Sequence, residues 1–108
     1  LLGISIILYL VFFLDIIGQR PGEVAVLQRG DRYIYYLVTK EKYWEKPSYT
    51  DLRSSLLQMS THCFKHGVKH LAMPKIGCGL DGLSWPKVKK ILEEVFHGTG
   101  IHISVYSY

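Results

Sequence analysis

The residues best suited to chemistry in this sequence lie in a glycine-rich stretch, residues 73–82, which reads MPKIGCGLDG. Its three glycines fall within six positions, so the backbone can turn sharply and approach a ligand without interference from Cβ atoms. A short apolar run, residues 70–74, leads into the stretch, and a helical pattern beginning near Ser84 follows it. Where such a loop joins a strand to a helix, its N–H groups can bind a phosphate. The stretch therefore predicts a site for a phosphate-bearing ligand, on which its one acid, Asp81, acts.

A second candidate residue, Lys40, follows a predicted β-hairpin. The two strands of this hairpin, residues 23–28 and 33–39, are rich in β-branched and aromatic residues, and the turn sequence 29–32 separates them. Lys40 comes directly after the second strand. Taken alone, it is most simply interpreted as a surface lysine.

The hairpin is followed by a predicted helix and a third strand. Ser48 starts the helix, with Asp51 three residues on as in a capping box, and Gly67 ends it. Residues 68–74 form the third strand. The apolar face of the helix is interpreted as core and comprises Tyr49, Leu52, Leu56, Met59 and Cys63.

A second helix is predicted after the glycine-rich stretch, capped by Ser84 and with Pro86 in its first turn. Its inward face comprises Val88, Ile91, Leu92, Val95 and Phe96. Residues 101–106 alternate as a last strand. Strands that alternate with helices predict an α/β domain with a mixed sheet. Because ligands of such sheets bind beyond the carboxyl ends of the strands, Lys40 and the glycine-rich stretch are expected on one rim.

The composition is that of one small globular domain. The chain has 108 residues, of which 48% are hydrophobic and 20% charged, and this balance argues against disorder. A formal net charge of +4 favours the approach of phosphorylated partners, but the basic residues are too scattered to predict nucleic-acid binding. The two cysteines, Cys63 and Cys78, form no CxxC pair, which favours a reducing compartment without disulfides.

Two histidines raise metal binding as an alternative function. His62 and His66 share a helix face at i,i+4, but Cys-Phe-Lys separates them, rather than the Glu-x-x spacing of a zincin. Two surface histidines are therefore the preferred interpretation, and no metal site is predicted.

The first 17 residues form a strongly apolar segment that allows several interpretations. Residues 1–14 carry no charge, and the apolar run continues past Asp15 to Ile17. The run is slightly shorter than the roughly 20 apolar residues that a transmembrane helix needs, and it lacks the flanks of a signal peptide. A buried helix or strand, a membrane anchor and sequence foreign to the domain all remain open, with a buried or accidental segment preferred. The domain itself is placed at residues 18–108.

Residues 77–82 also fit the pattern G-x-G-x-x-G of dinucleotide-binding folds. That motif opens its fold, whereas only one helix and one strand follow here, and residues 100–103 lack the required acid. A hydride-transferring Rossmann enzyme is therefore disfavoured. Cys78 is also disfavoured as a thiol nucleophile, because no histidine stands in a matching position and a small loop residue explains it.

At this loop the chain resembles the macrodomain family, and within it the ADP-ribose protein glycohydrolases that also deacetylate O-acetyl-ADP-ribose. The resemblance covers residues 21–108. It rests on separated blocks at residues 22–27, 33–37, 39–40, 46–47, 73–81 with Trp85, and 93–96. It implies a three-layer α/β/α fold with a mixed sheet. It also implies an earlier region with the first strands, an adenine-contacting acid and a second ligand loop, so the macrodomain is expected to be incomplete at its N-terminus.

The resemblance implies roles for individual residues. Lys40 attacks the anomeric carbon of the distal ribose, displaces the carboxylate of a modified Glu or Asp, and leaves a lysyl adduct. Asp81 is the acid/base that resolves this adduct. The implied ligand-binding residues are Lys75, Ile76, Gly77, Cys78, Gly79, Leu80, Asp81 and Tyr108.

These expectations describe a glycohydrolase that removes mono-ADP-ribose from acidic side chains and deacylates O-acyl-ADP-ribose, without a cofactor. A non-catalytic ADP-ribose-binding module and an inactive truncated fragment are the alternatives. The expected partners are ADP-ribose and mono-ADP-ribosylated proteins, with no specific nucleic acid, and a membrane only if the first 17 residues are an anchor. A monomer in the nucleus and cytoplasm, acting in the DNA damage response, is expected.

Overall fold

The computed structural model describes residues 4–12, 20–40, 47–76, 78 and 82–106, with the backbone alone at 4–12 and at Lys40. Within these residues the elements are β1 (Ile4–Phe12), β2 (Glu23–Arg29), β3 (Arg32–Lys40), α1 (Tyr49–Lys65), β4 (His70–Pro74), α2 (Trp85–Phe96) and β5 (His102–Tyr106). The predicted hairpin, both helices and the two later strands are confirmed, each within about two residues of the expected bounds, as is usual for element ends.

The strands form one sheet in the order β2-β3-β1-β4-β5. β2 is antiparallel to β3, whereas β3, β1, β4 and β5 run parallel, so the predicted mixed sheet is confirmed. The apolar segment at residues 4–12 is the central strand: Ile6 of β1 pairs with Ile34 of β3 on one side and Ala72 of β4 on the other. Strands inside parallel sheets are typically near-continuous apolar runs, and the sequence of β1 is apolar except at Ser5.

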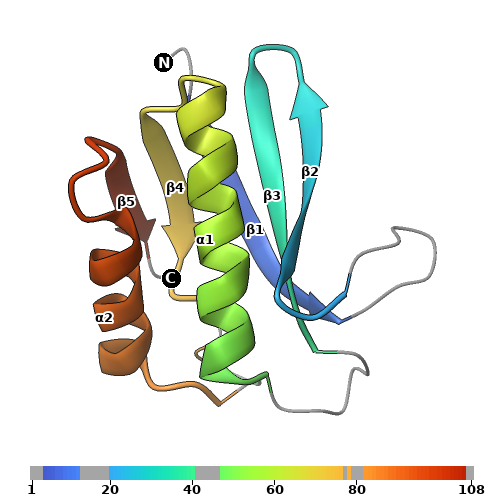
Figure 1. The fold of residues 1–108 in the computed structure, drawn as a ribbon, viewed down its shortest axis with the longest axis vertical. Coiled ribbons are helices and arrows are strands. Elements are labelled where there is room, and N and C mark those ends of the chain that lie inside the picture. The colour runs from blue at the N-terminus through green and yellow to red at the C-terminus, as the bar shows by residue number, and fades with distance from the viewer. Residues whose placement is uncertain (1–3, 13–19, 41–46, 77, 79–81, 107–108) are drawn as a thin grey trace.

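Both helices cover the same face of the sheet (Figure 1). α1 lies over the middle of the sheet and α2 over its β5 end, so the described residues form two layers. The second helical layer of an α/β/α arrangement is not among these residues. The core lies between the sheet and the helices. Its fully buried members include Tyr35, Leu37, Leu52, Leu56, Met59, Met73 and Val88.

The first helix has the predicted cap, and the second does not. The Asp51 N–H donates to Ser48 Oγ at 3.0 Å, as expected for an N-cap. Ser84 occupies the N-cap of α2, but its side chain makes no capping hydrogen bond, so that part of the prediction is wrong. Pro86 explains the difference in part, because it stands at the second helical position and has no N–H to donate to a cap.

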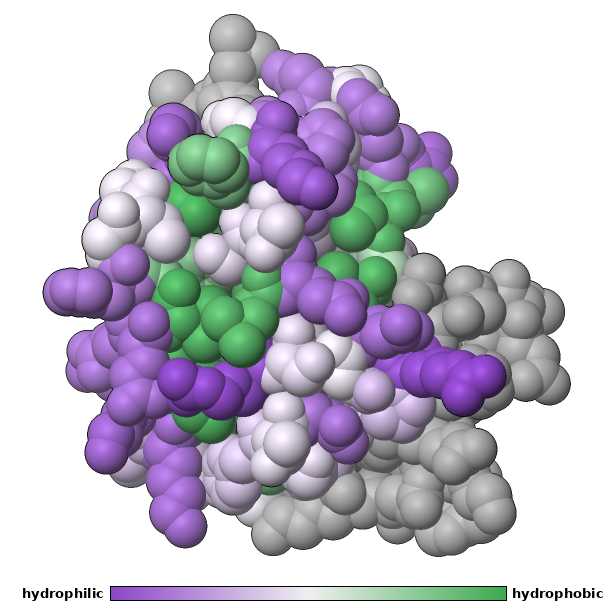
Figure 2. All heavy atoms as spheres, viewed as in Figure 1, coloured by the Kyte–Doolittle hydropathy of each residue, from purple (hydrophilic) through white to green (hydrophobic). Residues whose placement is uncertain are grey.

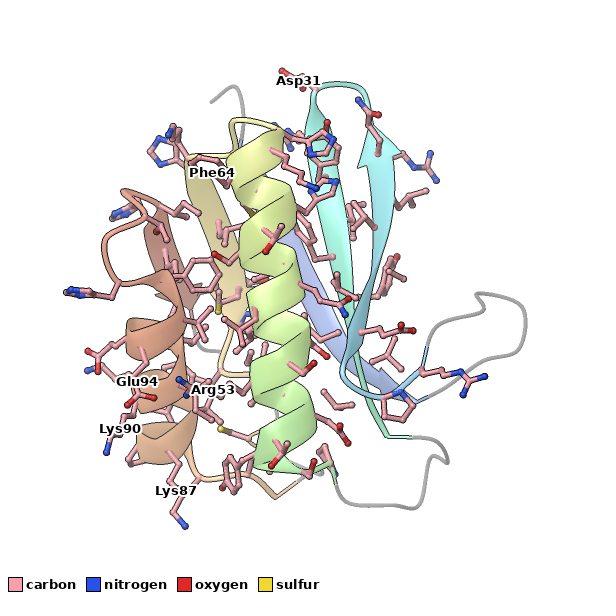
Figure 3. All side chains as sticks on the ribbon, in the orientation of Figure 1. Asp31, Arg53, Phe64, Lys87, Lys90 and Glu94 are labelled. Carbon is pink, nitrogen blue, oxygen red and sulfur yellow. The ribbon has the colours of Figure 1, made fainter. Side chains whose placement is uncertain are left out.

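The helices contact one another through an ion pair. Arg53 of α1 and Glu94 of α2 point toward each other (Figure 3), and their charged atoms are 2.7 Å apart. The face that carries the helices is mostly hydrophilic with a few hydrophobic patches (Figure 2). Phe64 is the most exposed large hydrophobic residue described. Neither described helix is long and apolar enough to span a bilayer.

Candidate ligand-binding site

The two segments that carry the candidate catalytic residues end at the same edge of the sheet. β3 ends at Lys40 and β4 ends at Pro74, and both run parallel to β1, which lies between them. Neighbouring strands are about 4.8 Å apart, so the backbones of β3 and β4 lie roughly 10 Å from each other. The expectation that Lys40 and the glycine-rich stretch lie beyond one rim therefore agrees with the sheet topology.

The pairing register places the ends of β3 and β4 at different positions along the strand direction. Ile34 and Ala72 both pair with Ile6, so they lie level with each other. Lys40 comes six residues after Ile34, whereas β4 ends only two residues after Ala72. At about 3.3 Å per residue, Lys40 extends roughly 13 Å further than the end of β4. The backbone of Lys40 and the start of the glycine-rich stretch are therefore offset along the strand direction.

The stretch begins in the core and turns immediately. Ile76 is 3% exposed and belongs to the hydrophobic core, while the preceding Lys75 is exposed. The Cys78 N–H donates to the Lys75 carbonyl at 3.3 Å, which closes a turn around Ile76. The buried isoleucine side chain thus anchors the loop and leaves Lys75 at the surface.

The far end of the stretch is fixed as well. Gly82 has a φ of +73°, a conformation that glycine adopts readily, and the next residue, Leu83, is buried. The Ser84 N–H then donates to the Tyr49 hydroxyl at 2.9 Å. Tyr49 is the first residue of α1, so this bond ties the end of the loop to the helix that follows the Lys40 segment.

Two lysines lie over aromatic rings near the loop. Lys75 Nζ is 6.0 Å from the centre of the Trp85 ring, and Lys87 Nζ is 5.5 Å from the centre of the Tyr49 ring. Both distances fall in the range of cation–π contacts. These contacts place positive charge beside both ends of the glycine-rich stretch, which suits an anionic ligand.

A groove of about 640 Å³ opens beside Lys75, between α2 and β5. Its floor is apolar and includes Leu92, Phe96 and Ile103, while Lys75 and Lys89 contribute charge. The groove adjoins the start of the glycine-rich stretch.

The Cys78 thiol is half-buried, and its Sγ lies 3.4 Å from the Ile76 carbonyl oxygen. Burial raises the pKa of this thiol, and the positive charge of Lys75 offsets part of that effect. A raised pKa lowers the thiolate fraction at neutral pH, which agrees with the sequence-based preference for a small loop residue rather than a nucleophile.

Several predicted site residues lie outside the described residues. These are Gly77, Gly79, Leu80, Asp81 and Tyr108, together with the side chain of Lys40. Of the predicted set, the structure describes the side chains of Lys75, Ile76 and Cys78. It brings these three together at the start of the loop.

Sequence reasoning missed the role of Tyr49 at the site. Its place in the apolar stripe of α1 predicted a core residue, and its ring does pack against the core. The hydrogen bond to Ser84 spans 35 residues of sequence, so no local pattern contains a signal for it. Among the described residues, no three His, Cys, Asp or Glu side chains gather closely enough to hold a metal ion.

A family model described as Macro domain matches residues 17–92. This chain belongs to the Macro domain family. The structural matches extend further toward the N-terminus than the family model, because they cover 97–99% of the chain and so include β1. The predicted family and α/β fold are therefore confirmed.

Two relatives share sequence similarity with most of this chain. ADP-ribose glycohydrolase OARD1 of Bos taurus is 56% identical over 89 residues, which cover 82% of this chain and 59% of that protein. Protein 032R of Invertebrate iridescent virus 6 is 41% identical over 88 residues, covering 82% of this chain and 87% of that protein. The chain thus spans about three-fifths of the length of OARD1.

Solved structures share the fold at low sequence identity. The macrodomain of Thermus aquaticus DarG matches with a TM-score of 0.80 and 19% identity, covering 99% of this chain and 90% of that chain. Thermosipho africanus DarTG in complex with ADP-ribose matches with a TM-score of 0.78 and 16% identity, covering 97% of this chain and 38% of that chain. At these identities the likeness supports the fold alone.

Proposed function

We propose that this chain is an ADP-ribose glycohydrolase that removes mono-ADP-ribose from acidic side chains and deacylates O-acyl-ADP-ribose. The observation that carries the proposal is the 56% identity to ADP-ribose glycohydrolase OARD1 over 89 residues. A match of this length on this chain includes Lys40 and the glycine-rich stretch, as the family model does. The parallel ends of β3 and β4 at one sheet edge support it, because a shared edge allows Lys40 and the glycine-rich stretch to face one ligand.

In the proposed reaction the Lys40 amine attacks the anomeric carbon of the distal ribose. The bond from that carbon to the glutamate or aspartate oxygen breaks, the carboxylate leaves with the electron pair, and a lysyl adduct forms. Water then replaces lysine at the same carbon, with Asp81 transferring the proton. The backbone of residues 75–80 holds the diphosphate and distal ribose.

The two proposed catalytic groups place opposite demands on the lysine. An amine must be unprotonated to attack, so Lys40 requires desolvation or a partner that lowers its pKa. A carboxylate paired with it would favour the ammonium form instead. We therefore propose that Lys40 and Asp81 exchange a proton through the substrate rather than form a resting ion pair.

The decisive assay is the release of ADP-ribose from a glutamate-linked mono-ADP-ribosylated protein. Lys40→Ala should abolish release, whereas Lys90→Ala, an exposed lysine on α2 (Figure 3), should leave it unchanged. No release by the parent chain would overturn the enzyme proposal. Binding of free ADP-ribose by that inactive parent would then assign a non-catalytic ADP-ribose-binding module, and absence of binding an inactive fragment.

The proposed setting is a monomer in the nucleus and cytoplasm. The location is supported by Cys63 and Cys78, which are both free thiols, as expected in a reducing compartment. Size-exclusion chromatography with light scattering tests the monomer, and fluorescence microscopy of the tagged chain tests the location. A stable dimer, or a purely secretory location, would overturn the respective part.

A further inference from the structure

The end of α1 is joined to β3 by a cluster of rings. The imidazole rings of His62 and His66 stack with their centroids 3.9 Å apart and their planes at 14°. The ring of Tyr33, near the start of β3, meets both of them edge-on, with centroids 4.8 and 5.4 Å away. His66 is exposed, whereas His62 is partly buried, so the predicted surface position holds for His66 but not for His62.

A chain of hydrogen bonds continues from His62 into the core. The Tyr35 hydroxyl lies 2.8 Å from His62 Nδ1, and the Cys63 thiol donates to the same hydroxyl at 3.4 Å. Tyr35 and Cys63 are both fully buried, and burial raises the pKa of each, so both keep their protons at neutral pH. Because the thiol proton is directed at the Tyr35 oxygen, the Tyr35 proton is available for Nδ1 of a neutral His62.

This arrangement opposes a second proton on His62. An imidazolium carries a proton on both nitrogens, so it can no longer accept from the Tyr35 hydroxyl. Among the described residues, the buried Tyr35 proton would then be left with the Cys63 sulfur, which is a weak acceptor. Burial disfavours the charged ring and a positive charge on the stacked His66 repels it, and together they lower the pKa of His62.

The neighbouring elements add no strong counter-charge from the described residues. The titratable groups that face His62 are Tyr33 and Tyr35 of β3, and Cys63 and His66 of α1 itself. α2 contacts α1 through the Glu94–Arg53 ion pair, and Arg53 lies nine residues before His62. β2 contacts α1 through hydrogen bonds between neutral groups. Among these residues, the charge that acts on His62 is therefore that of His66.

We propose that these rings form an acid-sensitive latch, made by His62 and His66 of α1 against Tyr33 and Tyr35 of β3. At neutral pH the stacked pair holds at most one proton, and the last turn of α1 stays docked on the strand. A second proton separates the two rings and releases that turn. His66 Nδ1 also donates to the His62 carbonyl at 2.9 Å, so its departure removes a hydrogen bond from the end of the helix.

The direction of the pH effect follows from proton linkage. When the helix end is open, His62 binds its proton near the ordinary pKa of about 6.5, whereas the docked ring binds it at lower pH. The open form therefore takes up more protons as the pH falls. The latch contributes its full stability above about pH 6.5, and this contribution declines until the pH has passed the lowered pKa of His62.

The latch is separate from the proposed glycohydrolase site. Tyr33 is the second residue of β3 and Lys40 is the last, so the two features lie at opposite ends of that strand (Figure 1). Acid should therefore open the domain first at the end of α1, away from the glycine-rich stretch. The inference stands whether or not the chain hydrolyses ADP-ribose.

The test is hydrogen exchange by mass spectrometry on the untagged chain between pH 7.5 and 5, corrected for the intrinsic exchange rate at each pH. The reporters are the His66 and Val68 amides, which donate to the His62 and Cys63 carbonyls across the last turn. In the parent, their opening constant should rise by up to about tenfold for each pH unit below 6.5, the limit for uptake of one proton.

His62→Gln keeps a polar side chain beside Tyr35 but cannot titrate, so the rise with acid should disappear. His97→Gln, at the exposed end of α2, is the matched control and should follow the parent. An opening constant that does not change with pH in the parent would overturn the proposal, as would an equally steep rise in His62→Gln. Loss of the rise in His102→Gln would also overturn it, because His102 faces His70 with ring centroids 5.8 Å apart and that pair would then be the sensor.

A nuclear magnetic resonance titration of the histidine rings needs no variant. The His62 ring of the folded parent should titrate at lower pH than the same ring in the urea-unfolded chain. His66→Phe keeps a stacked ring without a charge, so it should move the His62 midpoint upward. A His62 midpoint at or above that of the unfolded chain, or one that His66→Phe leaves unchanged, would refute the coupled pair.

Discussion

The hydroxyl of Tyr49 joins two segments that the proposed chemistry needs to hold together. It accepts the hydrogen bond from the Ser84 N–H at 2.9 Å. Ser84 comes three residues after Asp81, and Tyr49 comes nine residues after Lys40. This single bond therefore limits how far the end of the glycine-rich stretch can move from the start of α1.

Tyr49→Phe removes the hydroxyl and keeps the ring, which packs against the core and lies 5.5 Å from Lys87 Nζ. A neutral hydrogen bond contributes about 0.5–1.5 kcal/mol to the free energy of unfolding. Tyr49 and Ser84 are both partly buried, so water replaces the phenol only in part. We expect a loss of about 1 kcal/mol. For a domain of this size the melting temperature should fall by about 4–6 °C.

The Cys78 thiol reports on the loop directly. Cys78 is half-buried within the stretch, whereas Cys63 is fully buried in the core. A loss of 1 kcal/mol changes an opening equilibrium by a factor of about five. Alkylation of Cys78 should therefore be about fivefold faster in Tyr49→Phe than in the parent. Mass spectrometry of the modified peptides separates the two thiols.

Tyr36→Phe is the matched control for this measurement. Tyr36 is partly buried in β3, and its hydroxyl makes no hydrogen bond with the described residues, so labelling of Cys78 should not change. If Tyr49→Phe lowers the melting temperature but leaves the labelling rate at the parent value, the bond stabilises the fold without restraining the loop. The reasoning about the site would then be wrong.

Three further changes test the packing and electrostatics. Gly22→Ala should lower the free energy of unfolding by more than about 1 kcal/mol in urea titrations, because Gly22 has a φ of +91° and a Cβ there would lie 3.1 Å from Ser54 Oγ. Thr39→Val should raise it by about 1 kcal/mol, because the buried Thr39 hydroxyl has no hydrogen-bond partner among the described residues. The hydrogen bond from Arg53 holds the pKa of Glu94 below its usual value. The contribution of this ion pair is therefore present at neutral pH and lost as the pH falls through that lowered pKa, and Arg53→Ala should flatten this acid slope in urea titrations.

Local structure was predictable where the chemistry is local. The hairpin turn contains Gly30 with a φ of +62°, and a Gly-Asp pair between two β-rich segments indicates such a turn. The stripe on α1 was predictable for the same reason, since Leu52, Leu56 and Met59 recur at helical spacing and are all fully buried. In both cases the determining residues are neighbours in sequence.

The central strand is not predictable from its own sequence. Residues 4–12 are apolar except for Ser5, and such a run fits a buried helix or a buried strand equally well. Whether the segment forms a helix or a strand depends on its pairing with β3 and β4, which lie about 30 and 65 residues later in the chain. The height difference between Lys40 and Pro74 has the same origin, because it follows from the pairing register and not from any motif.

The pattern on β3 explains why local reasoning predicted an α/β domain without deciding the number of layers. Successive side chains of a strand point to opposite faces, so Tyr35 and Leu37 face the helices and are fully buried. Ile34 and Tyr36 point to the other face and are only partly buried. A strand that is apolar on both faces is typical of a sheet with helices on both sides. The described helices cover one face only, so the sequence of β3 matches the three-layer fold that the family resemblance implied better than it matches the two layers these residues form.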